Sequence, residues 1–174
     1  MKALSTLLAS RIDWFSSKGR ERMIWDYIVL ANKLAWMRQG SFFAAAVLAA
    51  LYFDALTIFT YYGVVVLTEL LDIHLVRQAK KWDKQDPVIG SRILKRIAFN
   101  TALSAVAISA FIINIAIQQD APGHFTPLFF LISASVFAAI YNSQMAGILL
   151  LRLTIYGVAF LYIALLDVFR YSPP

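Results

Sequence analysis

Long apolar segments separated by short polar ones fill most of the chain, and this pattern predicts membrane-spanning helices. The stretch 41–76 is too long for one crossing of a hydrocarbon core about 30 Å thick, so it predicts a two-helix hairpin with its turn near Asp54 and residues 57–62. Further spans are predicted at about 97–117, 127–146 and 149–168. The predicted fold is therefore all-α, a polytopic helical membrane protein with about five transmembrane helices.

Residues 1–39 have a different pattern, in which apolar residues recur at helical spacing but basic residues interrupt them too often for a membrane span. This predicts an amphipathic helix on the bilayer surface, in two pieces broken near residues 16–19. The apolar stripe of the second piece includes Ile24, Tyr27 and Ile28. The Trp residues expected at headgroup depth are Trp14, Trp25 and Trp36. A helix packed on a partner domain is the alternative.

Basic residues gather on one side of the predicted transmembrane domain, residues 40–174. Of the 16 Lys and Arg residues, seven precede Gly40 and seven lie in the linker 77–96, whereas the loop 118–126 has none. Positive charge is concentrated in cytoplasmic segments of membrane proteins. The charge distribution therefore places the N-terminus and the linker in the cytoplasm.

Composition supports lipid as the main partner of the chain. Hydrophobic residues make up 60% of it, more than the 45–50% or so of soluble domains. The net charge of +6 does not indicate nucleic acid, because the basic blocks flank apolar segments and would face anionic headgroups. The chain has no Cys and no phosphate-loop, zinc-protease or nucleophile-elbow motif. No catalytic residue, cofactor or metal site is predicted.

Ionisable residues occur near the cytoplasmic end of the second predicted span. Glu69 and Asp72 share one helical face, but His74 is turned about 200° from Asp72. A metal or proton site would need partners from other helices, such as Asn142 or Gln144. The pairing expected for a polar helix end is with the basic residues that follow, Arg77, Lys80 and Lys81.

Polar residues in the later spans are candidates for a ligand-sensing cavity, with helix capping as the default role. They are Asn100, Asn114, Asn142, Gln144 and Arg152. Two stripes of small residues at four-residue spacing predict close helix packing in lipid. They are Thr101, Ala105 and Ser109 in the third span, and Ser135, Ala139 and Ser143 in the fourth. An oligomer interface, such as that of a homodimer, is the alternative role of these stripes.

The layout, with a basic start, a tight hairpin and a basic linker, resembles the N-terminal membrane region of bacterial sensor histidine kinases, particularly hybrid ones. The segments that carry the resemblance are 126–131, 137–142 and 151–157. The resemblance implies a module in the bacterial inner membrane that senses an unidentified signal and relays it to a kinase core outside this chain. His74 and His124 match no phosphoacceptor motif, so neither inherits that role.

A second hypothesis is a free-standing small membrane protein that serves as a structural or assembly subunit of a membrane complex. Parity separates the two hypotheses, because five crossings from a cytoplasmic start leave the C-terminal end outside. A kinase core would then require one more span after Pro174.

Overall fold

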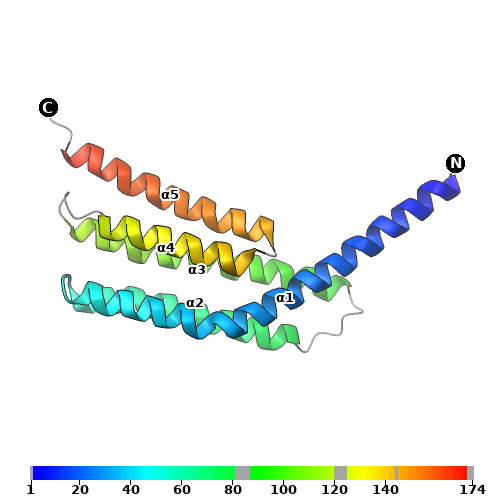
Figure 1. Cartoon of the computed structure of the whole chain (residues 1–174), viewed down its shortest axis with the longest axis horizontal. Coiled ribbons are helices and arrows are strands. Elements are labelled where there is room, and N and C mark those ends of the chain that lie inside the picture. Colours follow the sequence, from blue (N-terminus) through cyan, green and yellow to red (C-terminus); the bar gives the residue numbers. More distant parts are fainter. Residues whose placement is uncertain (1, 81–86, 120–124, 144, 172–174) are drawn as a thin grey trace.

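The structure is a computed structural model that describes residues 2–80, 87–119, 125–143 and 145–171. These residues form five helices, and the predicted all-α fold is confirmed for the part of the chain that they cover. The helices are α1 (Lys2–Ala50), α2 (Ala55–Lys80), α3 (Pro87–Gln118), α4 (Phe125–Asn142) and α5 (Ala146–Tyr171) (Figure 1).

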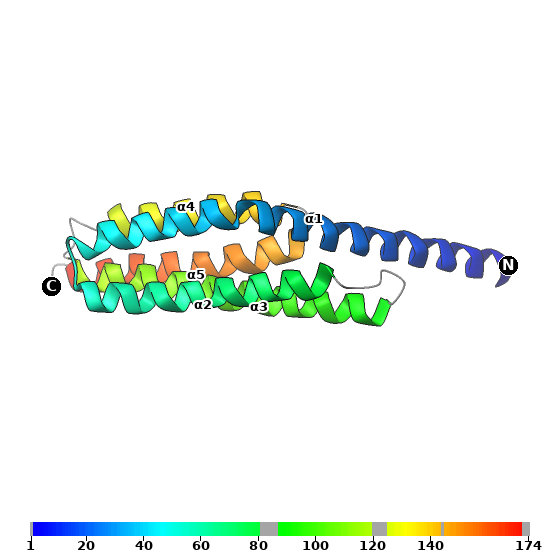
Figure 2. The same cartoon turned by 90° about the horizontal axis from the view of Figure 1, so that it is seen from below.

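Successive helices run in opposite directions and lie side by side in an elongated bundle, and the N-terminal part of α1 projects beyond it (Figures 1 and 2). Helix α3 is the central element, in contact with α1, α2, α4 and α5. In the most apolar stretch of α3, 56% of the residues are buried inside the protein, against 28% in the corresponding stretches of α2 and α5. More of the surface of α3 is therefore covered by neighbouring helices.

The turn between α1 and α2 covers residues 51–54, which includes the predicted Asp54, whereas residues 57–62 of the predicted turn region are helical. Asp54 caps α2, since its Oδ2 accepts a hydrogen bond from the backbone N–H of Thr57 at 2.9 Å and another from the Thr57 hydroxyl. These hydrogen bonds hold the pKa of Asp54 below its usual value. The Asp54 N–H also donates to Oε1 of Gln118 at 3.3 Å, which ties the turn to the end of α3.

Four helices among the described residues are long and apolar enough to cross a membrane. They are Ala55–Lys80, Ile89–Gln118, Phe125–Asn142 and Ala146–Leu166. This is the character of a helical membrane protein. The apolar end of α1, which the sequence predicts as a further span, is not among these four.

The predicted break in the first segment is wrong, and two other helix ends differ from the predicted ranges. Residues 16–19 are helical inside α1, because the low helix propensity of Ser and Gly costs too little to break a helix of 49 residues. The predicted linker 77–96 is helical up to Lys80 and again from Pro87, so the helices extend well beyond their apolar parts. The span predicted to end at 146 ends at Asn142, where α4 gives way to a short turn before α5.

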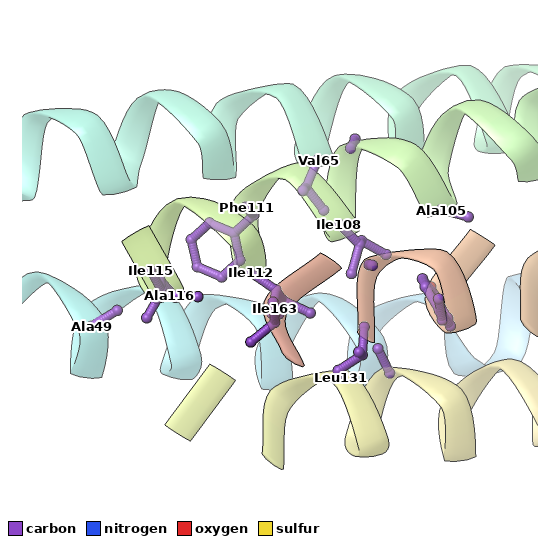
Figure 3. Packing of buried hydrophobic residues seen from close by; sticks show 14 of the residues in the cluster. Ala49, Val65, Ala105, Ile108, Phe111, Ile112, Ile115, Ala116, Leu131 and Ile163 are labelled. Carbon is purple, nitrogen blue, oxygen red and sulfur yellow. The ribbon is translucent and has the colours of Figure 1, made fainter. Parts of the chain in front are cut away.

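Two apolar clusters hold the bundle together. The larger one joins all the helices through Ala and Ile side chains, including Ala105, Ile112 and Ile163 (Figure 3). The smaller one packs α1 onto the start of α3 and neighbouring parts of α2 and α5, and its members are Ile24, Tyr27, Ile28, Val76, Ala79, Ile97, Met145 and Ile148. Ile24, Tyr27 and Ile28 of the predicted interfacial segment are thus buried against this chain's own helices.

Candidate functional site: a buried polar cluster

Polar side chains from all the described helices meet around one small cavity, and we call this set the polar cluster. From α1 and α2 it contains Tyr27, Arg38, Thr68, Glu69 and Asp72. From α3, α4 and α5 it contains Asn100, Thr101, Ser104, Tyr141, Asn142 and Arg152.

The centre of the polar cluster is an ion pair between α1 and α2. The Arg38 guanidinium donates a hydrogen bond from Nη2 to Oε1 of Glu69, and the same nitrogen lies 3.5 Å from Oδ2 of Asp72. Glu69 and Asp72 are three residues apart, and such residues are neighbours on one helix face. All three side chains are less than a tenth exposed. One positive charge is therefore shared by two carboxylates inside the bundle.

This partner differs from the predicted one. The sequence pattern paired Glu69 and Asp72 with basic residues further along their own helix, but Arg77 and Lys80 are exposed. The carboxylates point into the bundle, where the neighbouring helix supplies Arg38. Lys81 lies outside the described residues.

Neutral hydrogen-bond donors from two other elements complete the environment of Asp72. Its Oδ1 accepts from the Tyr27 hydroxyl at 2.7 Å and from Nδ2 of Asn100 at 3.2 Å. The same Asn100 amide lies 3.4 Å from the carbonyl oxygen of Thr68. Burial and the adjacent carboxylate of Asp72 raise the pKa of Tyr27 well above its usual value, so this hydroxyl stays a donor. Asp72 thereby joins α1, α2 and α3.

Helices α4 and α5 reach the polar cluster through an aromatic ring and a second guanidinium. The Arg38 guanidinium carbon lies 4.6 Å from the centre of the Tyr141 ring, a cation–π geometry. Nη2 of Arg152 donates to the Ser104 hydroxyl at 2.9 Å. The side-chain amide of Asn142 donates to the Ala138 carbonyl oxygen at 3.1 Å, within α4. Every described helix therefore contributes a side chain to the same network.

The polar cluster lies toward the bundle end that carries the ends of α2 and α4. With a rise of about 1.5 Å per residue, Asp72 is about 26 Å along α2 from Ala55, and Asn100 is about 27 Å from the end of α3. A hydrocarbon core about 30 Å thick that began at the Asp54 turn would end near this level. Charged groups there are less costly than at the bilayer centre.

Three of the five polar residues that the sequence singles out, Asn100, Asn142 and Arg152, come together in the polar cluster. Asn114 lies apart from them near the other end of α3, where its Oδ1 accepts a hydrogen bond from Gln118. Gln144 and His124 lie outside the described residues. His74 is exposed, 2.8 Å from the side chain of Gln78.

The two stripes of small residues have different environments. Thr101, Ala105 and Ser109 on α3 are buried, as close packing requires. Ser135 is half-buried, whereas Ala139 and Ser143 are exposed on α4. The α4 stripe is therefore less closely packed than the α3 stripe. Ser135 and Ala139 line an open groove between α4 and α5, opposite Gly157.

Sequence reasoning missed Arg38, Tyr27 and Tyr141. A usable signal existed for Arg38, because it lies 12 residues before the end of α1 while Glu69 lies 14 residues after the start of α2. In a hairpin with a tight turn, such positions are level with each other. Opposite charges at matching distances from a predicted turn therefore indicate a pair between the two helices.

A second cavity of about 280 Å³ lies between α1, α3 and α4, toward the opposite end of the bundle. Its lining is almost entirely apolar and includes Phe42, Phe111 and Phe130. Within the part of the chain that the structure describes, no group of three or more acidic or His side chains is placed to hold a metal ion.

Comparisons with models of known protein families, with curated proteins and with solved structures give no match. The fold and the site define the chain as an α-helical protein with candidate membrane spans around a buried, charge-paired polar cluster.

Proposed function

We propose that the chain is a membrane-embedded sensory and anchoring module that relays a signal through its helix bundle to a soluble domain. The observation that carries this proposal is the polar cluster, to which every described helix contributes. A displacement of one helix must break or stretch bonds to the others, so the cluster couples the helices mechanically. Helix α5 takes part through Arg152 and leads toward the end of the sequence.

The module crosses the bilayer five times, and the apolar end of α1 is the first crossing. The last 20 residues or so of α1 have the length of a span and lie beside α2. Arg38 falls inside this segment and lowers its mean hydropathy. Its charge is compensated by Glu69 and Asp72, which lowers the cost of placing it at that depth.

The surface of α1 fits this placement. Trp25 is 47% exposed and lies about 37 Å from the end of α1, just beyond a hydrocarbon core about 30 Å thick, which suits an interfacial Trp. Trp36 is 86% exposed at about 21 Å and would face lipid. The segment before Trp25 remains the proposed interfacial helix.

The proposed orientation has the N-terminus and the α2–α3 connection in the cytoplasm of a bacterium, and the membrane is the inner one. The charge asymmetry supports it, with seven basic residues before Gly40 and seven in residues 77–96. In this orientation the polar cluster lies at the cytoplasmic boundary of the membrane. That is where a rearrangement of the helices would be passed to a soluble domain.

In this proposal the soluble domain is a kinase core, because the chain resembles sensor histidine kinases. One further span would connect the module to that core. The module anchors that core, and a homodimer would bring two cores together. The competing function is that of a free-standing structural subunit of a membrane complex.

The test starts from the coding region beyond Pro174. A further apolar span followed by a kinase core supports the proposal, and a stop codon directly after Pro174, with co-purification of the chain in a larger membrane complex, contradicts it.

If the core is present, autophosphorylation of the full-length protein in vesicles should change in Arg152→Gln and stay unchanged in Arg77→Gln. Arg77 is an exposed Arg at the same end of the bundle, so it is the matched control. Equal activity of both variants would contradict relay through the polar cluster.

A further inference from the structure

Four buried polar atoms in the polar cluster have no hydrogen-bond partner among the described residues. They are Nε of Arg38, the hydroxyl of Tyr141, Oδ1 of Asn142 and Nε of Arg152. Each of the four residues is at most 6% exposed, and all four line the same small cavity. A buried polar atom left unpaired destabilises a protein, so four together demand an explanation.

We propose that the cavity is a binding site for one internal water molecule, which bridges Arg38 on α1 to Arg152 on α5. The chemistry of the four atoms matches that of a single water. The two Nε–H groups are donors only, and they would fill the two lone pairs of the water oxygen. Oδ1 of Asn142 and the Tyr141 hydroxyl oxygen can accept, and they would take its two hydrogens.

The size of the cavity selects the ligand. Its volume is about 10 Å³, and a water needs roughly 10–15 Å³ by this measure together with two to four polar partners. A phosphate, a carboxylate or a larger organic molecule does not fit without movement of the helices. The apolar cavity of about 280 Å³ could not hold an ordered water in the same way, because its walls offer almost no polar atoms.

The orientation of the side chains is consistent with this site. Nη2 of Arg38 contacts the carboxylates of Glu69 and Asp72. Nη2 of Arg152 donates a hydrogen bond to the Ser104 hydroxyl. In both Arg residues the Nε–H therefore remains for another acceptor. Two guanidinium groups repel each other, and a water oxygen between them screens that repulsion while accepting from both. The water would thus complete the connection between the first and last helices.

The direct test is an experimental structure of the full chain in lipid at a resolution that shows ordered water. We expect a density peak within about 2.7–3.2 Å of both Nε atoms and of Oδ1 of Asn142. The proposal is overturned if Nε of Arg38 and Nε of Arg152 bond to protein groups instead and no peak lies between them.

Variants make the test independent of one structure. Asn142→Leu has similar size but lacks the acceptor, and we expect it to lose the water. Solid-state NMR can follow this as loss of magnetisation transfer from water to the Nε–H groups of Arg38 and Arg152. Transfer that persists in Asn142→Leu would overturn the proposal.

Tyr141→Phe is the second variant, for use if Asn142→Leu does not fold. It keeps the ring beside the Arg38 guanidinium and removes only the hydroxyl. We expect weaker transfer to both Nε–H groups, with transfer to the exposed Arg77 unchanged as the internal control. Unchanged transfer to all three Arg residues would overturn the role of Tyr141 and with it the four-partner site.

Discussion

Nη2 of Arg38 on α1 lies 3.5 Å from Oδ2 of Asp72 on α2 while it also donates to Glu69, so one guanidinium holds two buried carboxylates. The relationship is asymmetric. Removal of Arg38 leaves two negative charges without their cation, whereas removal of either carboxylate leaves Arg38 with the other. Arg38 should therefore be the most sensitive position of the polar cluster.

Arg38→Gln is expected to lower the free energy of unfolding by about 3–5 kcal/mol, because it leaves buried carboxylates uncompensated. The measurement is a titration of the purified protein from mild detergent into a denaturing one, followed by circular dichroism. The control is Arg77→Gln on the exposed surface of α2, which should leave the unfolding curve in place. Equal losses in the two variants would mean that the ion pair contributes nothing specific.

Tyr27→Phe removes the hydroxyl that donates to Asp72 at 2.7 Å and keeps the buried ring. A hydrogen bond to a charged group contributes about 1.5–3 kcal/mol, so we expect a loss of stability in that range. Tyr52→Phe is the matched control, because Tyr52 is 76% exposed in the turn between α1 and α2. The same detergent titration compares them, and a Tyr27→Phe curve that coincides with that of Tyr52→Phe would refute the prediction.

The helices of the bundle could be predicted from the sequence because a membrane demands long apolar runs, and those runs are visible without any structure. The turn at Asp54 could be predicted for the same reason, since 41–76 exceeds one span. The ends of the helices were harder to predict from the sequence. Helices α2 and α3 continue past their apolar parts, because nothing in the polar flanking sequence stops a helix before Lys80 or after Pro87.

Only some of the residues in the polar cluster could be predicted from the sequence. Asn100, Asn142 and Arg152 are conspicuous because polar residues are rare in spans. Arg38 was assigned to an interfacial segment, since a lone Arg in lipid is costly and its carboxylate partners lie on a different helix. How closely one face of a helix packs on its neighbour depends on the packing of the whole bundle, and for this reason the sequence could not show that the α4 stripe lines an open groove.

The five-span topology predicts that Gly19 and Lys80 lie on one side of the membrane and Leu51 on the other. The chain contains no Cys, so single substitutions Gly19→Cys, Leu51→Cys and Lys80→Cys give labelling sites without background. All three positions are exposed. A membrane-impermeant maleimide added to intact cells should label only Leu51→Cys, and inverted vesicles should give the reverse pattern. Labelling of Gly19→Cys together with Leu51→Cys would mean that α1 does not cross.

Reporter fusions check the orientation independently of cysteine chemistry. A fusion at Asp86 should be active only as a cytoplasmic reporter, and one at Gly123 only as an external reporter, because the basic residues flank the first position and are absent around the second. The opposite pattern would reverse the topology while leaving the number of spans intact.

Ala105 and Ala139 test the two small-residue stripes with the same substitution in two environments. Ala105 is fully buried in the core of the bundle, whereas Ala139 is exposed on α4. Ala105→Leu forces extra volume between closely packed helices, so we expect a loss of about 1–3 kcal/mol in the free energy of unfolding.

Ala139→Leu should leave the stability of the isolated chain unchanged, because Ala139 is exposed in an open groove of about 430 Å³ between α4 and α5, which has room for the larger side chain. Its informative readout is the oligomeric state, measured by light scattering or crosslinking in a bilayer mimetic. If Ser135, Ala139 and Ser143 form a contact between two copies, Leu at 139 holds the backbones apart and shifts the equilibrium toward monomer. An oligomer that persists in Ala139→Leu would show that the α4 stripe is not its interface, and destabilisation of the monomer by this variant would contradict the placement of α4 itself.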